Sequence, residues 1–353
     1  MECFEIWSGH LKRRIGPGEK AFIVAEMSGN HNQSYEKAEK IIDAAADAGA
    51  DAIKLQTYTA GTITLDCKSD YFKLKKGPWK GMTLHELYEK AHTPWDWQPK
   101  LKKYAESKGL FFFSTPFDAI AVDFLEKMDV PLYKVASYEL GHIPLLKKIA
   151  RTKKPVLLSR GLSSPAEIEL AVKTLRENGS TAIAVLHCIA SYPAKPEEMN
   201  LAVIPDLGKR FNVIPGISDH SLGSTAAVAA VSLGAKVFEK HLILSRKDES
   251  PDASFSAEPE EFGELVQKVR DAEKMVGKVH YAPSKGEEKN QIFKPSIWVV
   301  KDVKKGEVFS ENNIAIRRPG NSLAPKLFES VLGKMASKDL KKCSPLEQED
   351  VAG

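Results

Sequence analysis

Short apolar runs alternate with amphipathic segments along most of this chain, and the alternation repeats eight times. The first pair is an apolar run at 21–25 and a segment at 35–48, in which alanine and isoleucine recur at helical spacing before Gly49. Strands that alternate with helices form parallel sheets, and eight such units close a (β/α)8, or TIM, barrel. The expected strands are 21–25, 52–55, 110–113, 132–135, 155–158, 182–186, 213–217 and 235–239. The expected helices are 35–48, 94–108, 119–127, 143–150, one opening at Ser164-Pro165, 200–210, 221–233 and 259–275.

Polar side chains stand at the end of every expected strand. In a TIM barrel the C-terminal ends of all strands open on one face, and active sites are built there. A doubly wound open sheet is the alternative fold, but the chain has no glycine-rich loop after its first strand, and such a sheet concentrates its chemistry near one switch point. A full ring of polar residues therefore predicts a barrel enzyme. In chain order the ring is Glu26, Lys54, Gln56, Ser114, Thr115, Lys134, Ser137, Glu139, Ser159, His187, Ser218, Asp219, His220, Glu239, Lys240 and His241.

Composition narrows the class of protein. The net charge of +4 over 353 residues gives no case for nucleic-acid binding, although a locally positive pocket for an anion is compatible with it. Cys3, Cys67, Cys188 and Cys343 are scattered without metal-type spacing, which fits a reducing cytosol. We find no apolar stretch of about 18 residues and no signal-type N-terminus. We therefore expect a cytoplasmic enzyme with no membrane segment.

The chain is longer than a barrel requires. We expect the barrel in residues 1–280, a polar linker in 281–295 and a second, compact domain in 296–353, where short strand-like and turn-like segments replace the earlier rhythm. About 60 residues make an independent core marginal, so we expect this domain to dock on something. Residues 57–93 have no clear period and are expected to form a long insertion over the barrel mouth.

Two histidines suggest a metal site. His220 and His241 close the seventh and eighth strands, which lie ~4.8 Å apart in a sheet, so both imidazoles can converge on one divalent ion. Two histidines with open positions suit a catalytic Mn, Fe, Co or Zn ion. Glu26, on the first strand, neighbours the eighth in a closed barrel and could orient a bound water. The alternative is that these histidines only form local hydrogen bonds.

Lysines and hydroxyls in the ring suit a phosphate. Lys54 and Lys134 offer point charges to an anion. A surface salt bridge is the alternative role for either lysine, and Lys134 could also serve as a Schiff-base nucleophile. Glu139 and Asp252 either bind sugar hydroxyls or are solvated acids. Trp79, Trp95 and Trp97 either contact sugar or pack the insertion, and Cys188 is expected to be buried and inert.

Six motifs in chain order resemble the sialic acid synthase family, whose members condense phosphoenolpyruvate with an amino sugar to give a nonulosonic acid. Each motif alone is weak, but together they are specific and cover nearly the whole chain. The segment Arg318-Pro319-Gly320-Asn321 is similar to the antifreeze-like (SAF) domain that follows the barrel in this family. The motifs are Ala25-Glu26 with Asn30-His31, Lys54-Leu55-Gln56, Ser114-Thr115-Pro116-Phe117-Asp118, Lys134-Val135-Ala136-Ser137, Ser218-Asp219-His220 and Glu239-Lys240-His241.

Within the family, the insertion resembles the pseudaminic acid synthase branch, which uses 2,4-diacetamido-2,4,6-trideoxy-L-altrose in place of N-acetylmannosamine. N-acetylneuraminic and legionaminic acid synthases are the alternatives within the family. The matching segments are Thr83-Leu84 through Leu87-Tyr88, Thr93-Pro94-Trp95, Asp252-Ala253-Ser254-Phe255-Ser256 and Glu258-Pro259-Glu260-Glu261-Phe262.

The resemblance implies roles for single residues. His220 and His241 would bind a divalent metal, with manganese expected and magnesium or cobalt as alternatives, and Glu26 would lie near the reacting carbons to deprotonate or orient water. Phosphoenolpyruvate would be held by Lys54, Thr115, Lys134, Ser137, Ser159 and Ser218. The N-acetylated amino sugar would be held by Gln56, Glu139, Tyr192 and Asp252, and by Arg318 from the partner subunit of a domain-swapped homodimer.

Two positions depart from the family pattern. Ala190 stands where Asn or Ser is usual near the phosphate, and Arg160 stands where Thr usually follows the serine of the fifth strand. The guanidinium of Arg160 could compensate for the missing contact or indicate another acceptor sugar. Outside the family, the rival functions are a Schiff-base aldolase that uses Lys134 and a non-enzymatic carbohydrate-binding protein.

Overall fold

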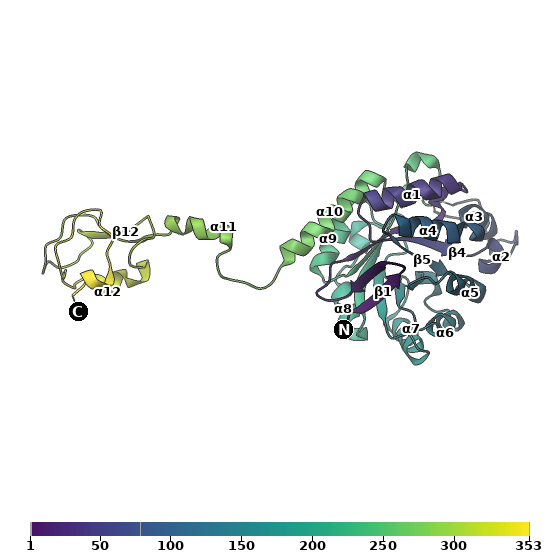
Figure 1. Ribbon diagram of the computed structural model, residues 1–353, viewed down its shortest axis with the longest axis horizontal. Helices are drawn as coiled ribbons and strands as arrows, with labels where there is room; N and C mark the ends of the chain where they lie inside the picture. The colour runs from purple at the N-terminus through teal and green to yellow at the C-terminus, as the bar shows by residue number, and fades with distance from the viewer. Residues whose placement is uncertain (1, 78, 353) are drawn as a thin grey trace. The chain divides into compact units, whose positions relative to one another are not determined.

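The chain divides into two compact units, Met1–Gly277 and Lys278–Gly353, in a computed structural model that describes residues 2–77 and 79–352 (Figure 1). In the first unit, eight parallel strands close a barrel in the order β10-β3-β4-β5-β6-β7-β8-β9. The TIM barrel expected from the sequence is confirmed. Its strands are β3 (Phe22–Glu26), β4 (Ala52–Thr57), β5 (Phe111–Pro116), β6 (Tyr133–Val135), β7 (Val156–Arg160), β8 (Ile183–Cys188), β9 (Ile214–Asp219) and β10 (Val237–His241).

Helices follow the strands in the expected alternation. Helix α8 begins later than expected because Asn200 has φ of 44°, which a helix cannot include. Helix α9 also begins late, because Ser221 bonds back to the Asp219 carboxylate and forms a turn. No helix in the described part of the chain is long and apolar enough to cross a bilayer. The helices are α1 (Tyr35–Asp47), α4 (Gln98–Ser107), α5 (Ala119–Lys127), α6 (Ile143–Ala150), α7 (Pro165–Glu177), α8 (Val203–Phe211), α9 (Thr225–Ser232) and α10 (Pro259–Val276).

An N-terminal hairpin lies outside the eight units. Strands β1 (Phe4–Ser8) and β2 (Leu11–Ile15) pair antiparallel, and Phe4, Ile6 and Ile15 pack into the core inside the barrel. The hairpin's apolar side chains therefore extend that core beyond the barrel strands. We did not expect this hairpin, since the first twenty residues read as mixed and charged.

The insertion at 57–93 contains two helices, α2 (Ala60–Ile63) and α3 (Leu84–Ala91). Helix α3 begins with a capping box, in which the Thr83 hydroxyl accepts from the Glu86 backbone and the Glu86 carboxylate accepts from the Thr83 backbone. The pattern Thr-x-x-Glu before an apolar residue is a sequence signal for such a start. The insertion is therefore more regular than we expected from its composition.

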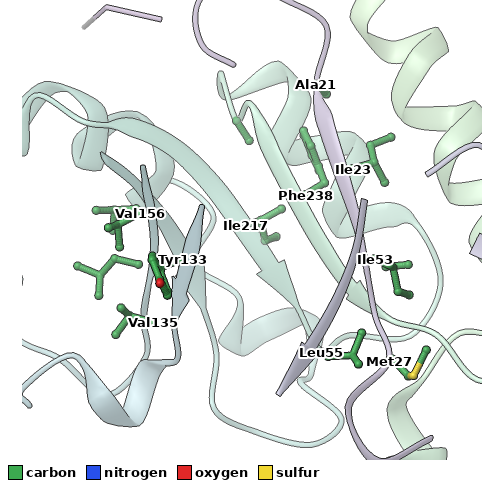
Figure 2. Close-up of a cluster of buried hydrophobic side chains, with 14 of the residues drawn as sticks. Ala21, Ile23, Met27, Ile53, Leu55, Tyr133, Val135, Val156, Ile217 and Phe238 are labelled. Atoms are coloured by element: carbon green, nitrogen blue, oxygen red, sulfur yellow. The ribbon is translucent and has the colours of Figure 1, made fainter. Parts of the chain in front are cut away.

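Side chains alternate between the two faces of each barrel strand, so the barrel wall has one apolar layer on its outer face and another on its inner face. Side chains that face outward, such as Ile23, Ile53 and Phe238, pack against the helices in the larger core (Figure 2). Side chains that face inward, such as Phe22 and Val24, form the smaller core with the hairpin. Because successive residues of a strand point to opposite faces, the inward series Phe22, Val24 continues to Glu26. The same count places Lys54, Thr115, Ser159, Ser218 and Glu239 inside the barrel mouth, whereas Ser114, His187, Asp219 and Lys240 of the expected polar ring face outward.

The second unit has its own small core and a two-stranded antiparallel sheet of β11 (Ser296–Val299) and β12 (Ile314–Arg317). Its helices are α11 (Lys285–Glu288) and α12 (Phe328–Val331). Short 3-10 turns in the two units are η1 (Ser28–His31), η2 (Trp95–Trp97), η3 (Ser137–Glu139), η4 (Pro196–Glu198), η5 (Arg246–Asp248), η6 (Ala253–Phe255), η7 (Lys289–Phe293), η8 (Pro325–Leu327) and η9 (Gln348–Asp350).

Candidate active site

A cavity of about 300 Å³ opens at the C-terminal ends of the barrel strands. Its floor is built from charged and hydroxyl side chains of the strands, and its walls carry aromatic and aliphatic side chains. Of the residues predicted for the site, it brings together Lys54, Gln56, Thr115, Lys134, Ser137, Glu139, Ser159, Tyr192, Ser218, His220, His241 and Asp252.

Two lysines and two glutamates form a buried cluster at the floor. Lys54 Nζ lies 2.6 Å from Glu26 Oε2 and 3.6 Å from Glu239 Oε1, and Lys134 Nζ lies 3.9 Å from the same Glu239 oxygen. All four side chains are almost inaccessible to solvent. Buried charges persist only when they are paired and hydrogen-bonded. The strand register explains the meeting, since Glu26 pairs with Lys54 on β4 and with His241 on β10.

Hydroxyl groups complete the lysine coordination. Lys54 Nζ donates to Thr115 Oγ1 at 3.2 Å, and Lys134 Nζ donates to Ser159 Oγ at 2.7 Å and to the Val135 carbonyl at 3.0 Å. These bonds hold both ammonium groups at the cavity floor, where an anion could replace part of the carboxylate contacts.

The pKa values of the two buried glutamates are shifted in opposite directions. Desolvation raises the pKa of Glu26 to about 7, an effect that Lys54 limits and Glu239 reinforces. Burial also opposes ionisation of Glu239, but Lys134 and Lys54 outweigh it, so its pKa is lowered. Burial alone would lower the pKa of Lys54, but the two glutamates outweigh burial and raise it. At Lys134 burial is the stronger effect, so the pKa of Lys134 is lowered. Glu239 is therefore the more readily ionised of the two carboxyls.

His220 and His241 lie side by side, with ring centroids 5.4 Å apart. His220 Nδ1 lies 2.9 Å from the Ile189 carbonyl, which assigns a proton to Nδ1 and leaves Nε2 as the nitrogen that a metal could take. Burial alone would lower the pKa of His220, but Cys188 and the Ile189 carbonyl outweigh burial and raise it. His241 Nδ1 is buried with no hydrogen-bond partner and lies 3.6 Å from Asp252 Oδ2. Burial, together with His220 and Lys54, lowers the pKa of His241 well below its usual value.

These features fit a metal ion held by two imidazoles. A metal ligand must be an unprotonated imidazole, and the second nitrogen of such a ligand is normally held by a carbonyl or carboxylate. Within residues 2–77 and 79–352, no group of three or more His, Cys, Asp or Glu side chains is arranged to hold a metal. An ion here would therefore take its remaining ligands from water or substrate.

The residues predicted for the sugar lie around the same cavity. Gln56 Nε2 donates to Glu26 Oε1 at 3.2 Å and to Ser28 Oγ at 3.1 Å. Burial raises the pKa of Glu139 to about 7 and also raises the pKa of Asp252. The Tyr192 ring packs on His220 with centroids 4.5 Å apart. These polar groups therefore border the histidine pair and the charged floor.

Several predicted residues lie elsewhere. Arg318 belongs to the second unit, where it is exposed and follows β12. Arg160 lies on the outer side of β7 and lines a separate cavity with His187, so the structure does not support compensation for Ala190 by its guanidinium. Trp97 packs against His31 and Tyr35 at ring-centroid distances of 5.6 and 5.5 Å.

The structure brings to the site two residues that the sequence analysis named without assigning them a role there. Glu239 joins both lysines and accepts from Ser218 Oγ at 3.0 Å. Its position two residues before His241, on the same face of β10, was the signal that could have identified it. Cys188 lines the cavity and its Sγ lies 3.8 Å from His220 Nδ1, so it is buried as expected but borders the site.

Comparison with known proteins identifies the families to which the two units are similar. The NeuB family matches residues 41–281 and the SAF domain matches residues 294–352. The pseudaminic acid synthase of Campylobacter jejuni (serotype O:2, NCTC 11168) is 42% identical over 94% of this chain and 97% of its own length. The N,N'-diacetyllegionaminic acid synthase of the same strain is 37% identical over 92% of this chain and 98% of its own length.

A solved structure shows the same relationship. The N-acetylneuraminic acid (sialic acid) synthetase of Leptospira borgpetersenii, in complex with citrate, superposes with a TM-score of 0.72 at 33% identity, covering 82% of this chain and 95% of the other. The SAF domain expected at the C-terminus is confirmed by the match to residues 294–352. The family resemblance found in the motifs is likewise confirmed: the chain belongs to the NeuB family.

Proposed function

We propose that this chain is a pseudaminic acid synthase, which condenses phosphoenolpyruvate with 2,4-diacetamido-2,4,6-trideoxy-L-altrose and water to give a nonulosonic acid and phosphate. The observation that carries the proposal is that Lys54, Lys134 and Glu239 line one cavity with the His220–His241 pair, while the buried Glu26 is paired with Lys54. The cluster suits the phosphate and carboxylate of one substrate, and the histidine pair suits the aldehyde end of the other.

The phosphoenolpyruvate site is proposed at Lys54, Thr115, Lys134, Ser137, Ser159 and Ser218. Both lysines are held in place before substrate arrives, so they stabilise phosphate charge without rearrangement during the reaction. A divalent ion bound by His220 and His241, proposed to be manganese, would supply Lewis-acid polarisation of the aldehyde oxygen.

Carbon 3 of phosphoenolpyruvate then attacks the aldehyde carbon of the open-chain sugar, which leaves a cationic centre at carbon 2. Water adds to carbon 2 and loses one proton, while the former aldehyde oxygen takes up a proton and becomes a hydroxyl. The new hydroxyl at carbon 2 then loses its proton as the carbon–oxygen bond to phosphate breaks, which gives the ketone and inorganic phosphate. Glu26 is the proposed acceptor of the proton that the water loses, because its pKa of about 7 matches the role of a general base near neutral pH. Gln56 holds the Glu26 carboxyl in orientation.

The sugar site is proposed at Gln56, Glu139, Tyr192 and Asp252, completed by Arg318 from the partner subunit of a domain-swapped homodimer. We also propose a synthase domain at 1–280, a linker at 281–295 and the SAF domain at 296–353. Phosphoenolpyruvate is a metabolite of central carbon metabolism, which supports a cytoplasmic location.

A legionaminic or N-acetylneuraminic acid synthase is the second candidate, favoured by the 37% identity to the legionaminic enzyme. A Schiff-base aldolase has weaker support. Lys134 Nζ donates hydrogen bonds to Ser159 and to the Val135 carbonyl and lies near Glu239, so these contacts already engage the nitrogen that a Schiff base would need.

Phosphate release from phosphoenolpyruvate tests these alternatives, with the trideoxy-altrose sugar and N-acetylmannosamine supplied separately. We expect phosphate release when the altrose sugar is supplied and none when N-acetylmannosamine is supplied. This release should be lost in EDTA and recovered when Mn²⁺ is added. Release with N-acetylmannosamine alone would move the chain to the neuraminic branch. Borohydride trapping of pyruvate on Lys134, without phosphate release or a metal requirement, would instead establish the aldolase.

A further inference from the structure

The active-site cavity has an apolar wall opposite its charged floor. Tyr58, Ile63, Trp79 and Leu87 of the insertion line this wall, and Phe117 adds to it from the loop after β5. Strand-end residues alone would surround a sugar with charges and hydroxyls. The insertion therefore adds an apolar surface that the barrel by itself lacks.

Trp79 is fixed in this wall by its only polar group. The indole Nε1 donates to the Pro251 carbonyl at 2.7 Å, so it has no hydrogen left for a ligand. The segment that carries Trp79 is itself held, because the Leu74 amide donates to the Met82 carbonyl and the Gly81 amide donates to the Leu74 carbonyl. Trp79 thus presents carbon atoms alone to the cavity.

A row of aromatic rings connects Trp79 with the histidine pair. Its ring centroid lies 5.8 Å from that of Tyr192, which in turn lies 4.5 Å from that of His220. An open-chain sugar with its aldehyde at the histidines and its carbon chain along Tyr192 brings its last carbons to Trp79. Trp79 also separates this cavity from a neighbouring one that Met82 lines.

We propose that Trp79 is a specificity-determining residue, which packs against the methyl group at carbon 6 of the acceptor and disfavours sugars with a hydroxyl there. This inference rests on the proposed function for the identity of the acceptor. A hydroxyl buried against this wall would lose its water without gaining a partner, whereas a methyl group gains apolar contact. One such group changes kcat/KM by about 10- to 200-fold in a hydrophobic pocket.

The test compares the 6-deoxy sugar with its 6-hydroxy counterpart, 2,4-diacetamido-2,4-dideoxy-altrose, in the full-length enzyme. We expect the wild type to favour the 6-deoxy sugar by about 10- to 200-fold in kcat/KM. Trp79→Ala should reduce this ratio to within a few-fold of one, and Trp79→Phe should retain most of it. The KM for phosphoenolpyruvate should change by less than about twofold, because Trp79 is not among the residues proposed to hold that substrate.

Met82→Ala is the matched control, since Met82 belongs to the same segment but lines the neighbouring cavity. It should leave the ratio unchanged. An unchanged ratio in Trp79→Ala, or an equal loss of kcat/KM on both sugars together with a raised KM for phosphoenolpyruvate, would overturn the proposal. Trp79→Leu replaces the alanine variant if circular dichroism shows that the latter is unfolded.

Failure of the proposed function gives a different result. If the wild type releases phosphate with N-acetylmannosamine and not with the altrose sugar, the proposed identity of the acceptor sugar is wrong. The same ratio, measured with N-acetylmannosamine and its 6-deoxy analogue, then decides the role of Trp79 independently. Loss of a 6-deoxy preference in Trp79→Ala supports that role, and an unchanged ratio rejects it.

Discussion

Glu26 and Glu139 are buried carboxyl groups with the same raised pKa of about 7, and their surroundings set different tasks for them. Glu26 is enclosed by Lys54, Glu239 and Gln56 at the floor, close to the proposed phosphate site. Glu139 ends η3, lines the cavity, and owes its raised pKa mainly to burial. Mutation to glutamine can therefore separate chemistry from sugar binding at these two positions.

A general base must be ionised to accept a proton, so activity should rise with pH through the pKa of Glu26. We expect kcat/KM for phosphoenolpyruvate to increase with pH and to level off above an apparent pKa near 7. Glu26→Gln should remove this limb and lower kcat by about 10²- to 10⁴-fold. Glu139→Gln serves as the control: it should retain the limb, and loss of the limb in this variant would assign it to Glu139.

Glu139 also predicts a pH dependence of stability. Its folded pKa of about 7 exceeds the unfolded value of 4.5, so the folded state binds more protons between these pH values and its stability falls as pH rises through this window. Glu139→Gln should therefore stabilise the protein at pH 8 by about 1–3 kcal/mol relative to wild type and change little at pH 4. Urea unfolding at both pH values measures this, and an equal effect at both would contradict the assignment.

At the scale of elements, strands β9 and β10 each carry some residues that face the cavity and others that face the helices. Ser218 and Glu239 face the cavity, whereas Asp219 and Lys240 face the helices and form a buried ion pair at 2.9 Å. Asp219 also accepts from the Ser221 backbone and hydroxyl. This pair joins the two strands immediately behind the residues proposed to act.

Removing one partner of this pair should be costly. Lys240→Met leaves the Asp219 carboxylate buried without its cation, and we expect a loss of about 3–5 kcal/mol of unfolding free energy. Lys240→Met combined with Asp219→Asn should recover part of the loss. The exposed pair Lys173–Glu177 provides the control, since Lys173→Met should change stability by less than about 0.5 kcal/mol in the same urea titration.

At the scale of the whole molecule, the chain consists of a barrel unit and a second unit with a separate core. Arg318, which the resemblance assigns to sugar binding, belongs to the second unit. We propose that Arg318 contacts the sugar bound to the partner subunit, so each active site would contain residues of both chains.

Mixed dimers test this arrangement directly. Co-expression of His220→Ala with Arg318→Ala should restore about a quarter of wild-type activity, because half of the dimers are mixed and one of their two sites has both residues intact. Each variant expressed alone should be much less active with the sugar. Absence of any restoration, with dimers confirmed by light scattering, would place Arg318 in the active site of its own chain.

Local pattern in the sequence determined the strand–helix order and the face of the barrel that carries the polar ring. The two-residue period of apolar side chains in strands and the 3.6-residue period in helices depend only on residues close in sequence, so they can be recognised without coordinates. The motifs around Lys54, Lys134 and His220 likewise identified the family. Regular structure escaped prediction where the local pattern was weak, as in the charged hairpin strand β2 and the helices of the insertion.

The tertiary structure alone decided which polar residues meet. Closure of the barrel brings Glu26 on the first barrel strand beside Lys54 and near Glu239 on the last. Burial at this floor raises the pKa of Glu26, whereas Lys134 and Lys54 outweigh burial and lower the pKa of Glu239. The tertiary structure also placed Trp79 at the cavity, while Trp97 packs elsewhere. Contacts between distant segments depend on chain closure and packing, and no local spacing encodes them.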